Sequence, residues 1–177
     1  MNDEYKVNTS PGSFNPDLVL GDRLGEGSFG TVFAASHKTY KKKLAVKFAI
    51  PQEKDASRDQ LLLEVKVMNS LKGLAGFPAV KEYRSNNKFE YLVMERMGPN
   101  LNQLLRHCGG KFSLKTGLML WMQMLERVEM LHSKGYIHRD IKPENFVVGA
   151  KGKLDCLYLI DFGLSKKYLQ PDGKICT

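Results

Sequence analysis

The chain has 177 residues, of which 42% are hydrophobic and 10% aromatic. This composition is typical of a globular protein that buries a core, and it excludes a chain that is disordered throughout. Twenty-seven Lys and Arg against nineteen Asp and Glu give a formal net charge of +8. Such a charge favours anionic partners, namely nucleotide phosphates, acidic or phosphorylated peptides, or nucleic acid. A basic surface that is only solvated explains most of the lysines equally well.

The N-terminal segment is polar, and we expect residues 1–17 to form a flexible leader. It lacks the apolar core of a signal peptide, and the sequence has no apolar run of 18 residues, so neither secretion nor a membrane span is expected. Cys108, Cys156 and Cys176 show no CxxC pattern and no pairing with histidine at zinc spacing. Reduced cysteines fit an intracellular protein of the cytoplasm or nucleus.

Residues 18–97 predict a five-stranded antiparallel sheet with one helix. Three strands are expected in residues 18–50, where strand formers are interrupted by glycines and by a lysine-rich turn. Two more are expected over 77–84 and 88–96. Between them, residues 57–71 predict a helix with Glu64 beside its apolar face. The apolar residues that share this face are Leu61, Leu62, Val65 and Met68.

After Gly98 and Pro99 the pattern becomes helical. A short helix is expected from Asn100 to about His107, and a longer one from Ser113, as its N-cap, to about Ser133. The longer helix has an apolar stripe at helical spacing that we expect to lie in a core. Its members are Leu114, Leu118, Trp121, Met122, Leu125 and Val128. Gly135 is expected to end the helix.

A glycine-rich segment follows the first predicted strand, with Gly25, Gly27 and Gly30 in the spacing GxGxxG. The same spacing occurs in dinucleotide-binding folds, but there a helix and an acidic residue follow, whereas here the next residues continue as a strand. A glycine hairpin whose backbone N–H groups lie over phosphates fits better, and an ordinary glycine-rich turn is the alternative. The residues assigned to this nucleotide-binding loop are Leu24, Gly25, Glu26, Gly27, Ser28, Phe29 and Gly30.

Lys47 lies in the middle of an apolar strand, where an unpaired ammonium group would be costly to bury. Glu64 on the predicted helix is the natural partner, and a lysine held in this way can present its remaining donors to nucleotide phosphates. A purely structural ion pair is the alternative. Val32 and Ala45 are expected to enclose a flat heterocycle. The segment that would hydrogen-bond its edge through backbone groups contains Met94, Glu95, Arg96 and Met97.

The segment HRDIKPENF begins at His138, and DFG begins at Asp161. Asp140 is placed to accept the proton of an attacking hydroxyl, and Lys142 can neutralise a moving phosphoryl group. Asn145 and Asp161 are the expected metal ligands, and Mg²⁺ suits their oxygen atoms. Either motif alone also occurs in ordinary turns. Both together, downstream of a glycine loop and a strand lysine, indicate phosphoryl transfer.

With GEGSFGTV, AVKF, Glu64, HRDIKPEN and DFG in this order, the chain resembles eukaryotic protein kinases. Lys142 followed by Pro143 resembles the serine/threonine-specific members. The segments GFPAV, VMERMGPNL, LHSKGYIHRDIKPENF and IDFGLSKKY resemble the casein kinase I family, and the match runs from about Val19 to Tyr168.

The resemblance implies an α+β fold of two lobes, with an ATP-binding N-lobe over 18–97 and a partial, mainly helical C-lobe over 98–177. It implies ATP and Mg²⁺ as cofactors and no nucleic acid as partner. It also implies protein substrates whose Ser or Thr lies near acidic or phosphorylated residues. Lys166, Lys167 and Lys174 are candidates for that preference, and solvated loop charges are the alternative.

Members of this family continue far beyond DFG, whereas the chain ends fourteen residues past Gly163. By resemblance we expect most of the activation segment and the remaining helices of the C-lobe to be missing, which would uncover the helix over 113–133. The 177-residue chain is then expected to be poorly stable, prone to aggregate, or completed by a partner. Two further hypotheses are a catalytically impaired module that binds nucleotide and a partner, and a product that never folds.

Overall fold

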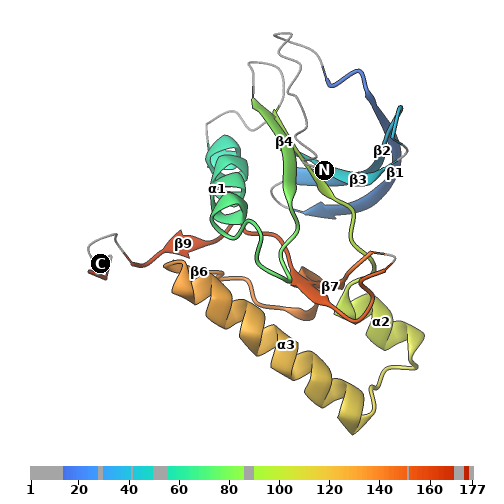
Figure 1. Cartoon of the computed structure of the whole chain (residues 1–177), viewed down its shortest axis with the longest axis vertical. Coiled ribbons are helices and arrows are strands. Elements are labelled where there is room, and N and C mark those ends of the chain that lie inside the picture. Colours follow the sequence, from blue (N-terminus) through green and yellow to red (C-terminus); the bar gives the residue numbers. More distant parts are fainter. Residues whose placement is uncertain are drawn as a thin grey trace.

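The N-terminal half of the chain forms a twisted five-stranded antiparallel sheet, and the C-terminal half packs below it (Figure 1). The structure, a computed structural model, describes residues 14–27, 30–40, 42–49, 56–85, 90–150, 152–169 and 174–175. The strands are β1 (Leu18–Gly27), β2 (Gly30–His37), β3 (Lys43–Ala49), β4 (Val80–Ser85) and β5 (Glu90–Glu95), in the order β1-β2-β3-β5-β4. The predicted sheet is confirmed.

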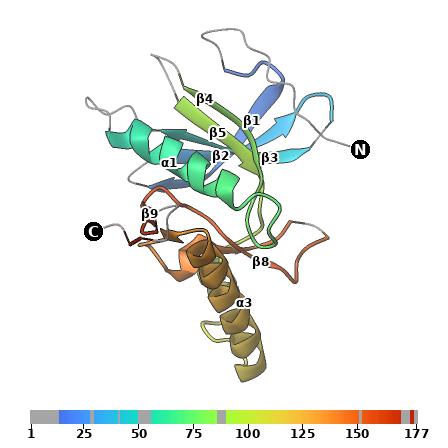
Figure 2. The same ribbon diagram turned by 60° about the vertical axis from the view of Figure 1, so that its left-hand side comes forward.

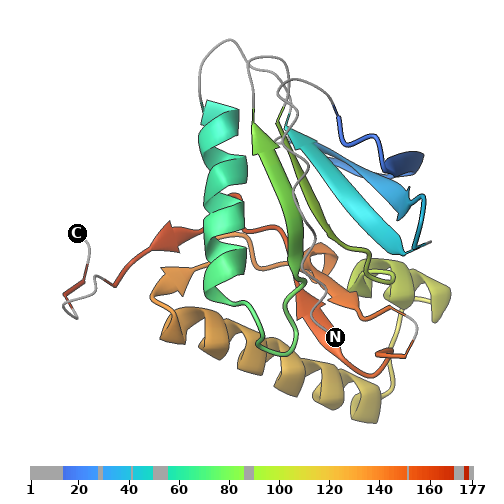
Figure 3. The same cartoon turned by 45° about the horizontal axis from the view of Figure 1, so that its top comes forward.

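Helix α1 (Ala56–Ser70) covers one face of the sheet and runs beside β4 (Figure 3). Its buried side chains include Leu61, Val65 and Met68 of the predicted apolar face, whereas Leu62 is only half-buried. Glu64 is buried with them, at 2% exposure. Because side chains three or four residues apart lie on the same side of a helix, Glu64 is directed with Leu61 and Met68 toward the sheet.

The opposite face of the sheet has its own small core, built from β1, β2, β3 and β5. Strand β3 alternates, with Leu44 and Val46 in this core and Ala45 and Lys47 on the other face. Phe14 packs against the rings of Phe48 and Tyr91, with ring centroids 5.6 and 5.2 Å apart. Residues 14–17 of the expected leader thus contact the sheet, and residues 1–13 lie outside the described part.

The C-terminal half contains α2 (Leu101–His107) and α3 (Leu114–Ser133), followed by short strands (Figure 2). The Asn100 side chain caps α2 in a capping box with Gln103, and Ser113 caps α3 as predicted. Strand β6 (Tyr136–Ile137) pairs with β9 (Lys166–Lys167), and β7 (Phe146–Val148) pairs with β8 (Leu157–Leu159), both antiparallel. A single 3₁₀ turn, η1 (Pro143–Asn145), precedes β7.

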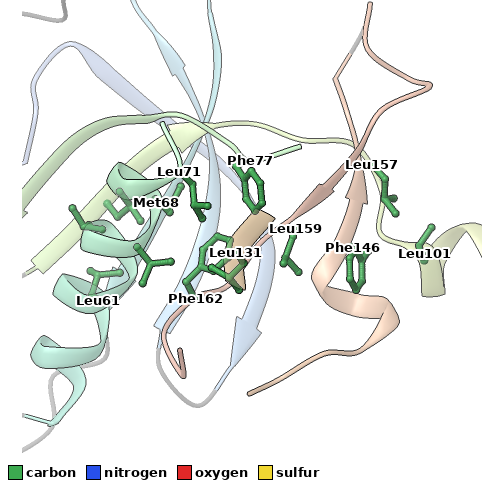
Figure 4. Packing of buried hydrophobic residues seen from close by; sticks show 13 residues of the cluster. Leu61, Met68, Leu71, Phe77, Leu101, Leu131, Phe146, Leu157, Leu159 and Phe162 are labelled. Carbon is green, nitrogen blue, oxygen red and sulfur yellow. The ribbon is translucent and has the colours of Figure 1, made fainter. Parts of the chain in front are cut away.

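One hydrophobic cluster joins the two halves, as Figure 4 shows. It brings Leu61 and Met68 of α1 together with Leu131 of α3, Leu159 of β8 and Phe162. Phe162 belongs to the segment between β8 and β9. Its place in the cluster holds that segment against α1. Within the described part, no helix has the length and apolar character needed to cross a membrane.

The prediction that the apolar stripe of α3 lies in a core is wrong for most of its members. Leu114, Trp121 and Met122 are 80%, 58% and 72% exposed, and Leu118 and Leu125 are also exposed. Helix α3 instead packs through a neighbouring face, which includes Leu120, Met124, Arg127, Val128 and Leu131. Both faces have helical spacing and apolar residues, so periodicity alone does not decide which of them is buried.

Two leucines of α3 provide a matched test of this correction. Leu131 is fully buried and Leu125 is 61% exposed. We expect Leu131→Ala to lower the free energy of unfolding by about 3 kcal/mol, because it leaves a cavity in the shared core. The same substitution at Leu125 should change it by less than about 0.5 kcal/mol. Urea denaturation measures both, and equal losses at the two positions would show that the stripe containing Leu125 is buried.

Candidate active site

A cleft of about 510 Å³ lies between the sheet and the loop that follows β6. Ser28 and Phe29 of the predicted site lie outside the described residues. Every other residue predicted for the site lines this one cleft except Arg96 of the connecting segment, which is not among the lining residues. From the N-terminal half these are Leu24, Gly25, Glu26, Gly27, Gly30, Val32, Ala45, Lys47, Glu64, Met94, Glu95 and Met97; from the C-terminal half they are Asp140, Lys142, Asn145 and Asp161.

Glycine is needed at Gly30 for a different structural reason than at Gly25 and Gly27, the other two glycines of the loop over the cleft. A Cβ at Gly30 would lie 2.3 Å from the carbonyl oxygen of Phe48, so the close approach of β2 to β3 requires glycine there. A Cβ at Gly25 or Gly27 would meet no protein atom within 4 Å. These two glycines therefore leave bare backbone at the roof of the cleft, which allows close approach by a ligand.

Lys47 joins the two halves of the molecule inside the cleft. Its Nζ lies 2.7 Å from Glu64 Oε2 on α1 and 2.7 Å from Asp161 Oδ1, which follows β8. Lys47 is 7% exposed, and burial by itself would lower the pKa of its ammonium group. The negative charges of Glu64 and Asp161 outweigh burial and raise this pKa above its ordinary value. Lys47 is therefore a permanent cation facing the cleft.

Asp140, Lys142 and Asn145 form one hydrogen-bonded group on the floor of the cleft. Lys142 Nζ lies 2.7 Å from Asp140 Oδ2, and Asn145 Nδ2 donates to the backbone oxygen and to Oδ2 of Asp140 at 2.8 and 2.9 Å. The hydrogen bond from Lys142, followed by that from Asn145, lowers the pKa of Asp140, although partial burial opposes the shift. Asp140 is therefore ionised at neutral pH.

His138 connects this loop to the segment that carries Asp161. Its Nε2 lies 3.0 Å from the carbonyl oxygen of Ile160, and the backbone N–H of Asp140 donates to its Nδ1 at 3.3 Å. Burial lowers the pKa of His138, and a neutral ring that donates from Nε2 satisfies both contacts. Arg139, which follows His138, and Asp161, which follows Ile160, have φ angles of 67° and 65°. Both adopt the left-handed conformation that non-glycine residues rarely take.

The donor atoms on the cleft floor fit a hard divalent cation. Both N–H groups of the Asn145 amide are used on Asp140, which leaves its oxygen as a ligand. Asp161 contributes a carboxylate whose side chain is 37% exposed to the cleft. Among the described residues there is no cluster of three or more His, Cys, Asp and Glu that could hold a metal. Mg²⁺ is commonly bound by one or two protein groups, with phosphate and water as its further ligands.

Several lining residues were missed by reasoning from the sequence. They are Pro78, Gly98, Asn100, Gln103, Glu144, Val147 and Ile160. Glu144 lies inside the HRDIKPENF segment and Ile160 directly precedes DFG, so proximity to a motif was an available signal. Asn100 and Gln103 reach the cleft because the capping box places the start of α2 at its rim. Pro78 and Val147 come from loops and strands whose positions depend on the packing of the two halves.

A glycine loop, a buried lysine paired with glutamate, and an aspartate-asparagine floor beside the Asp161 carboxylate are typical of a nucleotide-dependent phosphotransferase. The family model of the protein kinase domain matches residues 18–175. The chain therefore belongs to the protein kinase family, whose members use ATP and a divalent metal ion to phosphorylate proteins.

Lys47 and Glu64 allow a test of the buried charge arrangement. Lys47→Met is expected to lower the free energy of unfolding by about 3 kcal/mol, because the buried Glu64 carboxylate loses its cation. Lys47→Met combined with Glu64→Gln should regain most of this loss, because no buried charge is left without a partner. Urea denaturation of the single and double variants measures the coupling.

Arg23→Met is the matched control, since Arg23 pairs with Glu26 at the surface, where the two side chains are 60% and 55% exposed. An exposed pair of this kind contributes less than about 1 kcal/mol. Additive losses in the Lys47 and Glu64 variants would contradict the ion pair as described.

Proposed function

We propose that the protein is a serine/threonine kinase of casein kinase I type that transfers the γ-phosphate of ATP to protein hydroxyl groups. The observation that carries this proposal is the convergence of Lys47, Asp140, Asn145 and Asp161 on one cleft beneath the glycine loop. These residues come from β3, the loop after β6, and the segment after β8, so no short sequence motif brings them together by itself.

The residues that line the cleft differ in chemistry in a way that suits the different parts of ATP. Val32 and Ala45 are apolar lining residues, Ala45 pairs with Met94 across the sheet, and Met94, Glu95 and Met97 belong to the connection between the two halves. These residues suit the adenine ring, whose edge would meet backbone groups of that connection. The Lys47 ammonium suits the α- and β-phosphates, and the bare backbone of Gly25 and Gly27 suits the phosphates from above.

A bound Mg²⁺ would be held by the Asn145 oxygen and the Asp161 carboxylate, and it would neutralise charge on the phosphates. Asp140 orients the substrate hydroxyl by accepting its hydrogen bond. The hydroxyl oxygen forms a bond to the γ-phosphorus, and the bond from that phosphorus to the β,γ-bridging oxygen breaks, so ADP leaves. The hydroxyl proton passes to Asp140. Because its pKa is lowered, Asp140 is a weak base that orients the hydroxyl and accepts the proton late.

Lys142 stabilises negative charge on the transferred group. Its Nζ contacts Asp140 Oδ2 at 2.7 Å, which places a cation next to the oxygen that receives the proton. The hydrogen bond and charge of Asp140 raise the pKa of Lys142, so the side chain remains protonated throughout. Lys142 followed by Pro143 also supports serine/threonine specificity through the resemblance described above.

The positive charge of the chain supports a preference for substrates with acidic or phosphorylated residues near the target hydroxyl. The chain carries a formal charge of +8. Lys166 and Lys167 form the exposed strand β9, and Lys174 is also exposed. Strand β9 pairs with β6, which leads directly to His138, so Lys166 and Lys167 lie near the start of the loop that carries Asp140.

A second candidate is a nucleotide-binding module that holds a protein partner and does not transfer phosphate. The exposed apolar side chains of α3 favour it, because a continuous apolar face of this kind marks a protein contact. Nucleotide-dependent thermal stabilisation of the 177-residue chain without turnover would support the module. Clear turnover would exclude it.

The role of Asp140 is tested by Asp140→Asn. We expect transfer of radiolabelled phosphate from ATP to casein, an acidic phosphoprotein, to fall by about 10²–10⁴-fold, because the general base is lost. The affinity for ADP should stay within about threefold, since Asp140 is assigned to the hydroxyl and not to the nucleotide.

Lys111→Gln, a charge change at an exposed residue before α3, is the control and should leave transfer unchanged. Equal rates of transfer by Asp140→Asn and by the unmodified chain would refute the role assigned to this residue.

A further inference from the structure

Strand β8 carries the chain to Asp161, yet it is paired with a strand on one edge only. Its partner is β7, and the two form a two-stranded sheet in the described part of the chain. The backbone groups on the other edge are buried, since Leu157 and Leu159 are 1% and 0% exposed. Buried backbone N–H and C=O groups need partners, so something other than a strand has to satisfy this edge.

Side chains of α3 and one backbone carbonyl supply these partners. The N–H of Leu157 donates to Gln123 Oε1 at 2.7 Å, and the carbonyl of Leu157 accepts from Arg127 Nε at 3.0 Å. The N–H of Leu159 donates to the carbonyl of Gly76 at 2.9 Å. Gln123 also donates to the carbonyl of Asp155 at 3.1 Å. Helix α3 lies next to β8, as Figure 2 shows.

The arrangement is specific to these residue types. Gln123 and Arg127 are four residues apart on α3 and project from the same side, one as acceptor and the other as donor. Gly76 has a φ of 83°, and a Cβ at this position would lie 1.7 Å from Arg127 Nε. The arginine therefore packs directly on the glycine backbone. We call Gly76, Gln123 and Arg127 the edge clamp.

Burying the charged Arg127 side chain costs free energy, so stability alone does not explain its position. The residue is 4% exposed, and its guanidinium group contacts Glu126 Oε2 at 2.8 Å and approaches the sulfur atoms of Met130 and Cys156 at 3.9 Å. Removing a charged group from water costs free energy unless the group is paired and hydrogen-bonded. What an apolar side chain cannot do is hold the Leu157 carbonyl at a defined position.

Two residues after Leu159 the chain reaches Asp161, and the intervening Ile160 is held from the opposite side. The N–H of Ile160 donates to the carbonyl of Asn145 at 3.0 Å, and its carbonyl contacts His138 Nε2. We propose that the edge clamp positions Asp161 for metal binding by fixing β8 from the side of α3, so that Lys47 and Asn145 face its carboxylate. The metal-binding part of this inference rests on the proposed function.

The test compares the apo chain and its nucleotide complexes for Gln123→Leu and Arg127→Met, with Glu126→Gln as control. Glu126→Gln removes the exposed charge partner of Arg127 and keeps the bond to Leu157. The reporter is amide hydrogen exchange at Ile160, whose N–H donates to Asn145 and not to a clamp residue. We expect about tenfold faster exchange in both loss variants, equivalent to one net hydrogen bond, and no change in the control. Arg127→Lys, which keeps a cationic donor, should retain most of the protection.

The second readout is the dissociation constant of a fluorescent ADP analogue with and without Mg²⁺. In both loss variants the gain in affinity on adding Mg²⁺ should shrink by about tenfold, while the metal-free constant stays the same. Gln123 is half-buried, so Gln123→Leu keeps the test valid even if Arg127→Met unfolds.

Unchanged exchange at Ile160 in Gln123→Leu, with a cooperative melt, would overturn the proposal. Faster exchange at Ile160 together with no nucleotide binding by the unmodified chain would uphold the clamp and reject the proposed function instead.

Discussion

The structure depends on one buried ammonium group. Lys47 Nζ contacts Glu64, which is 17 residues away in the sequence, and Asp161, which is 114 residues away. Since none of these charges can be buried alone without a large cost, α1, β3 and the segment after β8 have to meet at one point. The two halves of the chain are therefore held in the relative position that forms the cleft.

Hydrophobic packing supports the segment that carries Asp161. The cluster that joins α1, α3 and β8 includes Phe162, which immediately follows Asp161 and is fully buried. Phe162 and His138 are in edge contact, with ring centroids 5.3 Å apart, so the catalytic loop and the Asp161 segment share one support. Strained backbone at Arg139 and Asp161 is stable only because these contacts hold both residues from several sides.

Much of this arrangement is readable from the sequence, because it follows local rules. Alternation in β3 separates Val46, which enters a core, from Lys47, which enters the cleft, and Ser113 marks the start of α3. The cleft residues are predicted by the glycine spacing, the strand lysine and the two later motifs. Each of these patterns indicates its own chemistry. Residues of the cleft that belong to no motif, such as Pro78 and Val147, depend on tertiary packing and have no such signal.

Helix α3 shows the limit most clearly. Its sequence offers two apolar faces, and only tertiary packing decides that Leu131 is buried while Trp121 is exposed. The polar contacts of Gln123 and Arg127 are equally hidden, because both residues are typical of a solvated helix surface. Their partners are backbone groups on β8, about thirty residues further along the chain, and backbone partners leave no pattern in a sequence.

A crystal structure of the chain with a non-hydrolysable ATP analogue and Mg²⁺ tests the central claim most directly. The account predicts α- and β-phosphate oxygens within hydrogen-bond distance of Lys47 Nζ, a metal ion bound by Asn145 and Asp161, and the γ-phosphate facing Asp140. A nucleotide bound outside the cleft, or side chains of these four residues turned toward different cavities, would contradict it.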